Sequence, residues 1–93
     1  MPYINQQTRN HLNQYLDPLA EEIFASENFA GDINYSISYI LARLTNYQLN
    51  YARANACVGA LECAKQEFYR RVVAPYEDAK IVQNGDVYET KET

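Results

Sequence analysis

One long segment, from Asn50 to Ala74, most constrains what this chain can fold into. Its apolar residues recur every three or four positions, which is the spacing of a helix that packs along one stripe. The stripe consists of Tyr51, Ala54, Val58, Leu61, Phe68 and Val72, with Lys65 among them. At a rise of about 1.5 Å per residue, this helix would be about 37 Å long. A large share of the chain is therefore committed to a single helix, with Asn50 as its N-cap.

A second stripe of the same helix carries only small side chains: Ala52, Ala56, Gly59 and Cys63. Small residues one turn apart let another backbone approach closely, and packing would offset the roughly 1 kcal/mol that a mid-helix glycine costs. A chain of 93 residues has little material with which to surround such a helix. The stripe therefore predicts a homo-oligomer. The alternative is a monomer whose alanines lie on a solvated face.

The preceding segment predicts a second helix, from Ile33 to Asn46, with Asp32 as its N-cap. Its apolar residues again follow a helical spacing: Ile33, Ile37, Ile40, Leu44 and Tyr47. The joint between the two helices, residues 47–49, is short, and so short a joint favours an antiparallel helical hairpin. We expect this hairpin to span residues 32–78.

The flanking segments predict smaller elements within one mainly all-α domain, residues 1–93. Residues 1–31 would form a loop and two short helices, over 5–16 and 18–26, with Asp17-Pro18 starting the second one. Pro75 removes a backbone donor, so the long helix should end or kink at Ala74. Asn84-Gly85 lies between β-prone runs and predicts a small β-hairpin over 79–89, followed by a disordered tail over 90–93.

A cluster of polar residues on the long helix is the candidate ligand site. Lys65 lies within the apolar stripe, where an ammonium must extend to water, pair with a carboxylate or meet a ligand. Arginine binds oxyanions bidentately and tyrosine stacks, so the cluster would suit a phosphate-bearing or aromatic small molecule. The candidate residues are Tyr51, Arg53, Glu62, Lys65, Tyr69 and Arg70. The alternative is helix-surface ion pairs, Glu62 with Lys65 and Glu67 with Arg71.

No pattern in the chain indicates catalysis, a metal or a cofactor. His11 is the one histidine, and neither a Ser-His-Asp order nor a metal-ligand spacing is present. The net charge of −4 argues against a protein that holds nucleic acid through many phosphate contacts. We therefore expect a non-catalytic protein without cofactor, metal or nucleic-acid partner.

The chain also lacks the sequence signals of membrane insertion and secretion. No apolar run approaches the roughly 20 residues of a membrane span, and the N-terminus does not resemble a signal peptide. Cys57 and Cys63 point to different faces of one helix, so they cannot bond to each other and are expected to be reduced thiols. These features predict a cytoplasmic protein.

Three stretches of the sequence resemble a family of small, uncharacterised proteins common in phages and bacterial genomes. They are LNYARAN at residues 49–55, the run from Leu61 to Val73 with EFYRRVV, and APYED with NGDVYE after it. The resemblance covers roughly the C-terminal half and the MPYI start, and it implies no activity or binding residue. Among phage proteins of similar size are oligomers that sequester nucleotide signals of host immunity in pockets between subunits, which is an analogy of size and origin.

Two functions fit these features. The first is a helical homo-oligomer, phage-encoded and located in the host cytoplasm, that binds a small anionic or nucleotide ligand between subunits. The second is a protein-interaction module that inhibits or bridges a host protein through its tyrosine-rich and acidic surfaces. Retention of a small molecule through purification would distinguish the first from the second.

Overall fold

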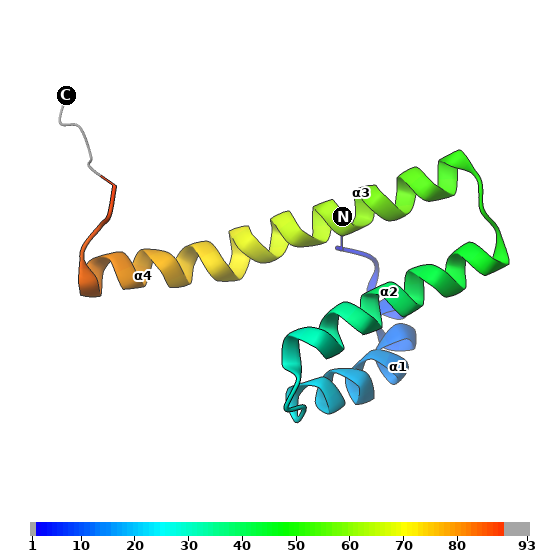
Figure 1. Ribbon diagram of the computed structural model, residues 1–93, viewed down its shortest axis with the longest axis horizontal. Helices are drawn as coiled ribbons and strands as arrows, with labels where there is room; N and C mark the ends of the chain where they lie inside the picture. The colour runs from blue at the N-terminus through cyan, green and yellow to red at the C-terminus, as the bar shows by residue number, and fades with distance from the viewer. Residues whose placement is uncertain (1, 89–93) are drawn as a thin grey trace.

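The computed structural model describes residues 2–88, and all of its regular structure is helical (Figure 1). The elements are α1 (Gln6–Phe24), α2 (Phe29–Tyr47), α3 (Tyr51–Phe68), a π-helical segment η1 (Tyr69–Val73) and α4 (Ala74–Asn84). The mainly all-α class predicted from the sequence is confirmed. The predicted tail, residues 90–93, lies outside the described residues.

Helix α1 replaces the two short helices that the sequence predicted. The Asn5 side chain caps it by accepting a hydrogen bond from the Thr8 backbone N–H at 2.9 Å. Pro18 lies inside the helix and does not begin a new one. A proline at this position leaves the carbonyl of Gln14 without its helical partner. Because residues 13–18 are exposed, water can bind that carbonyl, and the helix continues to Phe24.

Helix α2 begins at Phe29, four residues before the predicted start. Asp32 is therefore not the N-cap. It lies in the first turn, where a carboxylate still interacts favourably with the positive end of the helix dipole. The linker over residues 48–50 joins α2 to α3, and the two helices run antiparallel, as predicted (Figure 1). Asn50 caps α3 by accepting from the Arg53 backbone N–H at 2.9 Å.

The helix that begins at Tyr51 continues past Ala74, where the sequence predicted an end or a kink. It passes through η1, where the Ala74 N–H bonds to the carbonyl of Tyr69, five residues earlier. In a regular α-helix, the ring of Pro75 would clash with the carbonyl of Arg71. The wider π turn relieves that clash just before the proline, so the chain continues as α4. Together α3, η1 and α4 form one arm.

The predicted β-hairpin over 79–89 is wrong for residues 79–84, which belong to α4; residue 89 lies outside the described residues. Gly85 ends the helix with a positive φ of 92°, and its N–H bonds to the Ile81 carbonyl at 2.8 Å. Positive φ suits glycine both in a type I′ turn and just after a helix. Here Asn84-Gly85 serves as a helix stop.

Packing between helices is limited. α1 lies against α2, where Leu19, Ile23 and Ile33 are half-buried. α2 and α3 do not pack closely on each other. The outer part of the arm, α4, lies away from α1 and α2, and it is in substantial contact only with η1 (Figure 1).

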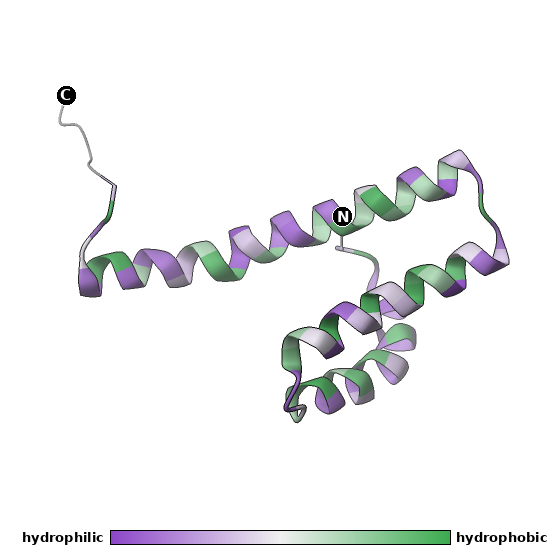
Figure 2. Ribbon diagram, viewed as in Figure 1, coloured by the Kyte–Doolittle hydropathy of each residue, from purple (hydrophilic) through white to green (hydrophobic). Residues whose placement is uncertain are grey.

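The described chain has no hydrophobic core of its own. None of its residues is buried, and apolar residues are spread over all the helices (Figure 2). The accessible surface is 8626 Å², whereas a folded monomer of this mass exposes about 5,500 Å². The radius of gyration is 17.7 Å, against about 12 Å for a compact domain of this length. The single chain therefore leaves apolar surface that a stable fold would cover.

Candidate binding site

A groove between α2 and α3, next to their linker, is a concave surface with a mostly apolar lining. Its volume is about 230 Å³. Its lining residues come from both helices and the linker, and most are apolar: Leu41, Leu44, Thr45, Gln48, Leu49, Arg53, Ala54, Ala56, Cys57, Val58 and Leu61. The groove lies where the short linker joins the two helices, which do not pack closely on each other.

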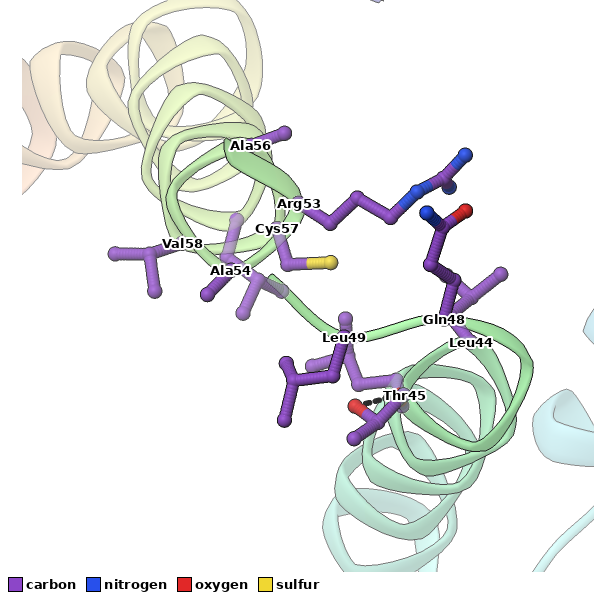
Figure 3. A pocket seen from close by; sticks show the side chains of 11 residues that line it. Leu44, Thr45, Gln48, Leu49, Arg53, Ala54, Ala56, Cys57 and Val58 are labelled. Carbon is purple, nitrogen blue, oxygen red and sulfur yellow. Dashed lines mark hydrogen bonds between the residues drawn. The ribbon is translucent and has the colours of Figure 1, made fainter. Parts of the chain in front are cut away.

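The polar groups of this groove gather at one edge. The polar ends of the Arg53 and Gln48 side chains approach each other at the mouth, and the thiol of Cys57 points into the space between the two helices (Figure 3). The Thr45 hydroxyl donates to the Leu41 carbonyl of its own helix at 2.9 Å, so its proton is not available to a ligand. The groove thus presents an apolar wall with one guanidinium and one amide at its rim.

The predicted ligand residues fall into two groups along the arm. Tyr51, 89% exposed, and Arg53 lie at the start of α3, and Arg53 lines the groove. Glu62, Lys65, Tyr69 and Arg70 lie farther along. From Arg53 to Lys65 the helix rises by about 18 Å, so a single chain does not bring the two groups into one small-molecule pocket.

Lys65 is paired with Glu62 at 3.5 Å, and its side chain is 74% exposed. The hydrogen bond from Gln66 and the charge of Lys65 lower the pKa of the Glu62 carboxyl. This is the helix-surface pair that the sequence offered as the alternative. The apolar stripe that contains Lys65 has Ala54, Val58 and Leu61 on the groove, and beyond Leu61 it faces solvent.

Arg70 belongs to a network that the sequence did not predict. It donates two hydrogen bonds to the Glu67 carboxylate, at 2.9 and 3.2 Å, and the Tyr3 hydroxyl donates to the same carboxylate at 2.5 Å. The Arg70 hydrogen bonds, and then that of Tyr3, lower the pKa of Glu67. The predicted partner of Glu67, Arg71, is therefore wrong, because Arg70 is the residue that binds it. The network ties the N-terminal segment to the arm.

Tyr69 bridges the π segment. Its hydroxyl donates to the Glu77 carboxylate at 2.6 Å, eight residues along the chain. This hydrogen bond and the charge of Glu77 raise the pKa of the Tyr69 hydroxyl. The contact spans η1 and Pro75, so Tyr69 has a local partner that any ligand would have to displace.

Other exposed aromatic side chains lie along α2, where Tyr35 and Tyr39 border a shallow pocket with Leu19 of α1. The rings of Tyr35 and Tyr39 stack with centroids 5.8 Å apart. The Arg43 guanidinium lies 5.4 Å from the centroid of the Tyr47 ring and donates to the Tyr47 hydroxyl at 2.9 Å. Tyr35, Tyr39 and Tyr47 are all more than half exposed. This surface offers flat rings to a partner or ligand.

Residues 2–88 were also compared with the requirements of a metal site and of a membrane-crossing helix. Within this range, no three His, Cys, Asp or Glu side chains are arranged to hold a metal ion. No helix in the same range combines the length and apolar character needed to cross a membrane.

Sequence reasoning missed several residues that shape these sites. Leu41, Leu49 and Cys57 line the groove, and Tyr3 binds Glu67. A signal for the groove residues was present, since Cys57 and Leu41 flank stripe residues on facing helices. Tyr3 had no such signal, because its partner lies 64 positions away.

Comparison with known proteins identifies the family of this chain. No curated protein and no solved structure matches the chain. A family model described as "Domain of unknown function (DUF6899)" matches residues 1–87. The match extends over both helices of the hairpin and the whole arm, and it agrees with the expected resemblance to an uncharacterised family. The chain therefore belongs to the DUF6899 family.

Proposed function

We propose that this protein is a non-catalytic homo-oligomer that binds a small anionic ligand of nucleotide type between its subunits. The observation that supports a homo-oligomer is the absence of any buried side chain among residues 2–88. An isolated chain with this much exposed apolar surface gains too little from burial to offset its conformational entropy. Further copies of the chain are the simplest source of the missing contacts.

The ligand class follows from the chemistry at the rim of the groove. Binding sites for small molecules are concave and mostly apolar, with a few polar groups that fix orientation. The α2–α3 groove has this character, and Arg53 at its mouth can bind an oxyanion bidentately. A single groove of about 230 Å³ is small for a nucleotide, so the site would be completed by a neighbouring subunit. In a phage-encoded chain, the ligand would be a nucleotide signal of host immunity.

A different observation supports a second candidate function. Lys65 and Arg70 are each paired with a carboxylate of their own helix, which weakens them as anion ligands. The tyrosine-rich surface of α2 remains exposed. Exposed aromatic residues are typical anchors of protein interfaces. The second candidate is therefore an interaction module that inhibits or bridges a host protein.

Native mass spectrometry of protein purified from cells distinguishes the two. The proposal predicts an oligomer with a retained small molecule, lost in Arg53→Ala and kept in Arg9→Ala, a matched change on α1. Lys65→Met and Arg70→Ala should weaken retention only if a neighbouring subunit brings them to the site. An oligomer that retains no small molecule but captures a host protein would favour the second candidate.

A further inference from the structure

The facing surfaces of α2 and α3 are apolar but do not pack on each other. Leu44 on α2 is 44% exposed and Leu61 on α3 is 40% exposed, while Val58 of α3, at the edge of the groove, is 68% exposed and points to the side of the hairpin, away from α2 (Figure 3). α2 and α3 have 19 and 18 residues, so they are nearly equal in length. The hairpin thus has an open inner side with a mostly apolar lining.

The amount of excess surface indicates how large the missing partner is. The chain exposes about 3,000 Å² more than a compact monomer of its mass. Obligate homodimers bury about 1,000–2,500 Å² on each partner. A short peptide in the groove would cover only a fraction of the excess, whereas a partner with two helices would cover an area of the required size.

The charges of the groove favour a partner that is itself apolar. Arg53 is the one charged residue among those that line it, and it lies at the rim. An acidic or basic partner would need opposite charges along the groove, and the lining does not supply them. A surface with the same apolar stripe does fit, and the chain itself carries that surface.

We propose that the α2–α3 hairpin of a second copy closes the open side, so that two hairpins interlock as a four-helix arrangement around Leu44, Val58 and Leu61, while the Arg53 rim of each groove stays at the edge of the contact, where the proposed ligand would bind. This proposal rests on the proposed homo-oligomer and names the surface that forms it. Four antiparallel helices bury such stripes in one shared core, which neither hairpin can form alone. The two-fold pairing is isologous, so each copy contributes the same residues.

Thiol labelling tests this interface without a disruptive substitution. Cys57 and Cys63 are first replaced by alanine, and a single cysteine is then introduced as Val58→Cys at the edge of the groove or as Asn55→Cys outside the groove lining. Both positions are exposed in one chain. The proposal predicts that native protein reacts with iodoacetamide about tenfold or more slowly at position 58 than at position 55, with equal rates in denaturant.

The oligomeric mass of the same samples distinguishes a failure of the interlocked hairpins from a failure of the proposed homo-oligomer. An oligomer in which position 58 reacts as fast as position 55 overturns the interlocked hairpins and leaves the proposed homo-oligomer standing. A monomer at every concentration overturns both proposals. Protection at position 58 that persists in a monomer means that the hairpin closes on itself, and it overturns the pairing. Protection that disappears on dilution together with the oligomer supports it.

Discussion

The N-terminal helix pair and the long arm differ in how far their apolar side chains are covered within one chain. α1 and α2 carry apolar stripes that meet each other, so Leu19, Ile23 and Ile33 become half-buried within one chain. α3 and α4 carry comparable stripes, yet Phe68 and Val72 on the arm remain more than half exposed. The difference teaches that an apolar stripe alone does not decide where a helix packs. For the stripe of the arm, which has no intramolecular partner, we propose an intermolecular one.

This comparison has a thermodynamic consequence. Contacts within a chain do not depend on protein concentration, whereas contacts between chains do. The arm should therefore lose its protection on dilution before the contacts of α1 with α2 are lost. The predictions below separate the two regions, beginning with the largest expected effect.

Val58→Asp should abolish the assembly. In the interlocked arrangement, the change places a charge without a partner in an apolar interface, at a cost on the order of 3–5 kcal/mol. We expect the oligomer to dissociate and the arm to lose its amide protection. Asn55→Asp, on the same helix but outside the groove lining, is the matched control and should keep the wild-type mass. Equal masses for the two variants would place the interface elsewhere.

Gly59→Leu distinguishes a solvated helix face from a second interface on the small-residue stripe. A Cβ at Gly59 would meet nothing within 4 Å in the single chain. If that face is solvated, the substitution should stabilise the helix by about 1 kcal/mol. If the stripe contacts another copy, as the sequence predicts, leucine should reduce the oligomeric mass and Gly59→Ala should not. Sedimentation of both variants shows directly whether the oligomeric mass falls.

Ile23→Ala should weaken the pairing of α1 with α2 and spare the arm. The side chain is half-buried, so we expect a local loss of about 1–2 kcal/mol, near the low end for truncation of a buried isoleucine. Hydrogen exchange should show faster opening of α1 while the oligomeric mass stays unchanged. Loss of the oligomer in this variant would mean that the two regions are not separable.

The smallest predicted effect is the release of the N-terminal segment at low pH. The pKa of Glu67 is lowered by Arg70 and Tyr3, so the network stabilises the fold above the ordinary glutamate pKa of about 4.3. That contribution is lost as the pH falls through the lowered pKa of the folded protein. NMR signals of Tyr3 should report the release. In Glu67→Gln, the Tyr3 signals should lack this acid transition, and an unchanged transition would contradict the assignment.

Much of the helical framework could be predicted from the sequence. The N-cap at Asn50, the short linker and the two apolar stripes are local features, and each is encoded within a few residues. The pair of Glu62 with Lys65 was likewise readable from a spacing of three. The homo-oligomer expected from the small-residue stripe and the chain length remains a prediction.

The prolines and the Asn-Gly dipeptide could not be interpreted correctly from local rules. Pro18 and Pro75 usually end or kink helices, but an exposed carbonyl in one case and a π turn in the other let the helix continue. Gly85 satisfies two motifs that require positive φ, and the preceding helix decides between them. The contact of Tyr3 with Glu67 depends on how distant segments meet, which no local pattern encodes.

The most direct test of the account is the mass of the wild-type protein in solution across a dilution series. Sedimentation equilibrium should give a multiple of the 10.7 kDa chain mass, with dissociation accompanied by loss of helix in the arm. A species of one chain mass that unfolds cooperatively at every concentration would contradict the claim that the apolar surface of this chain is completed by other copies.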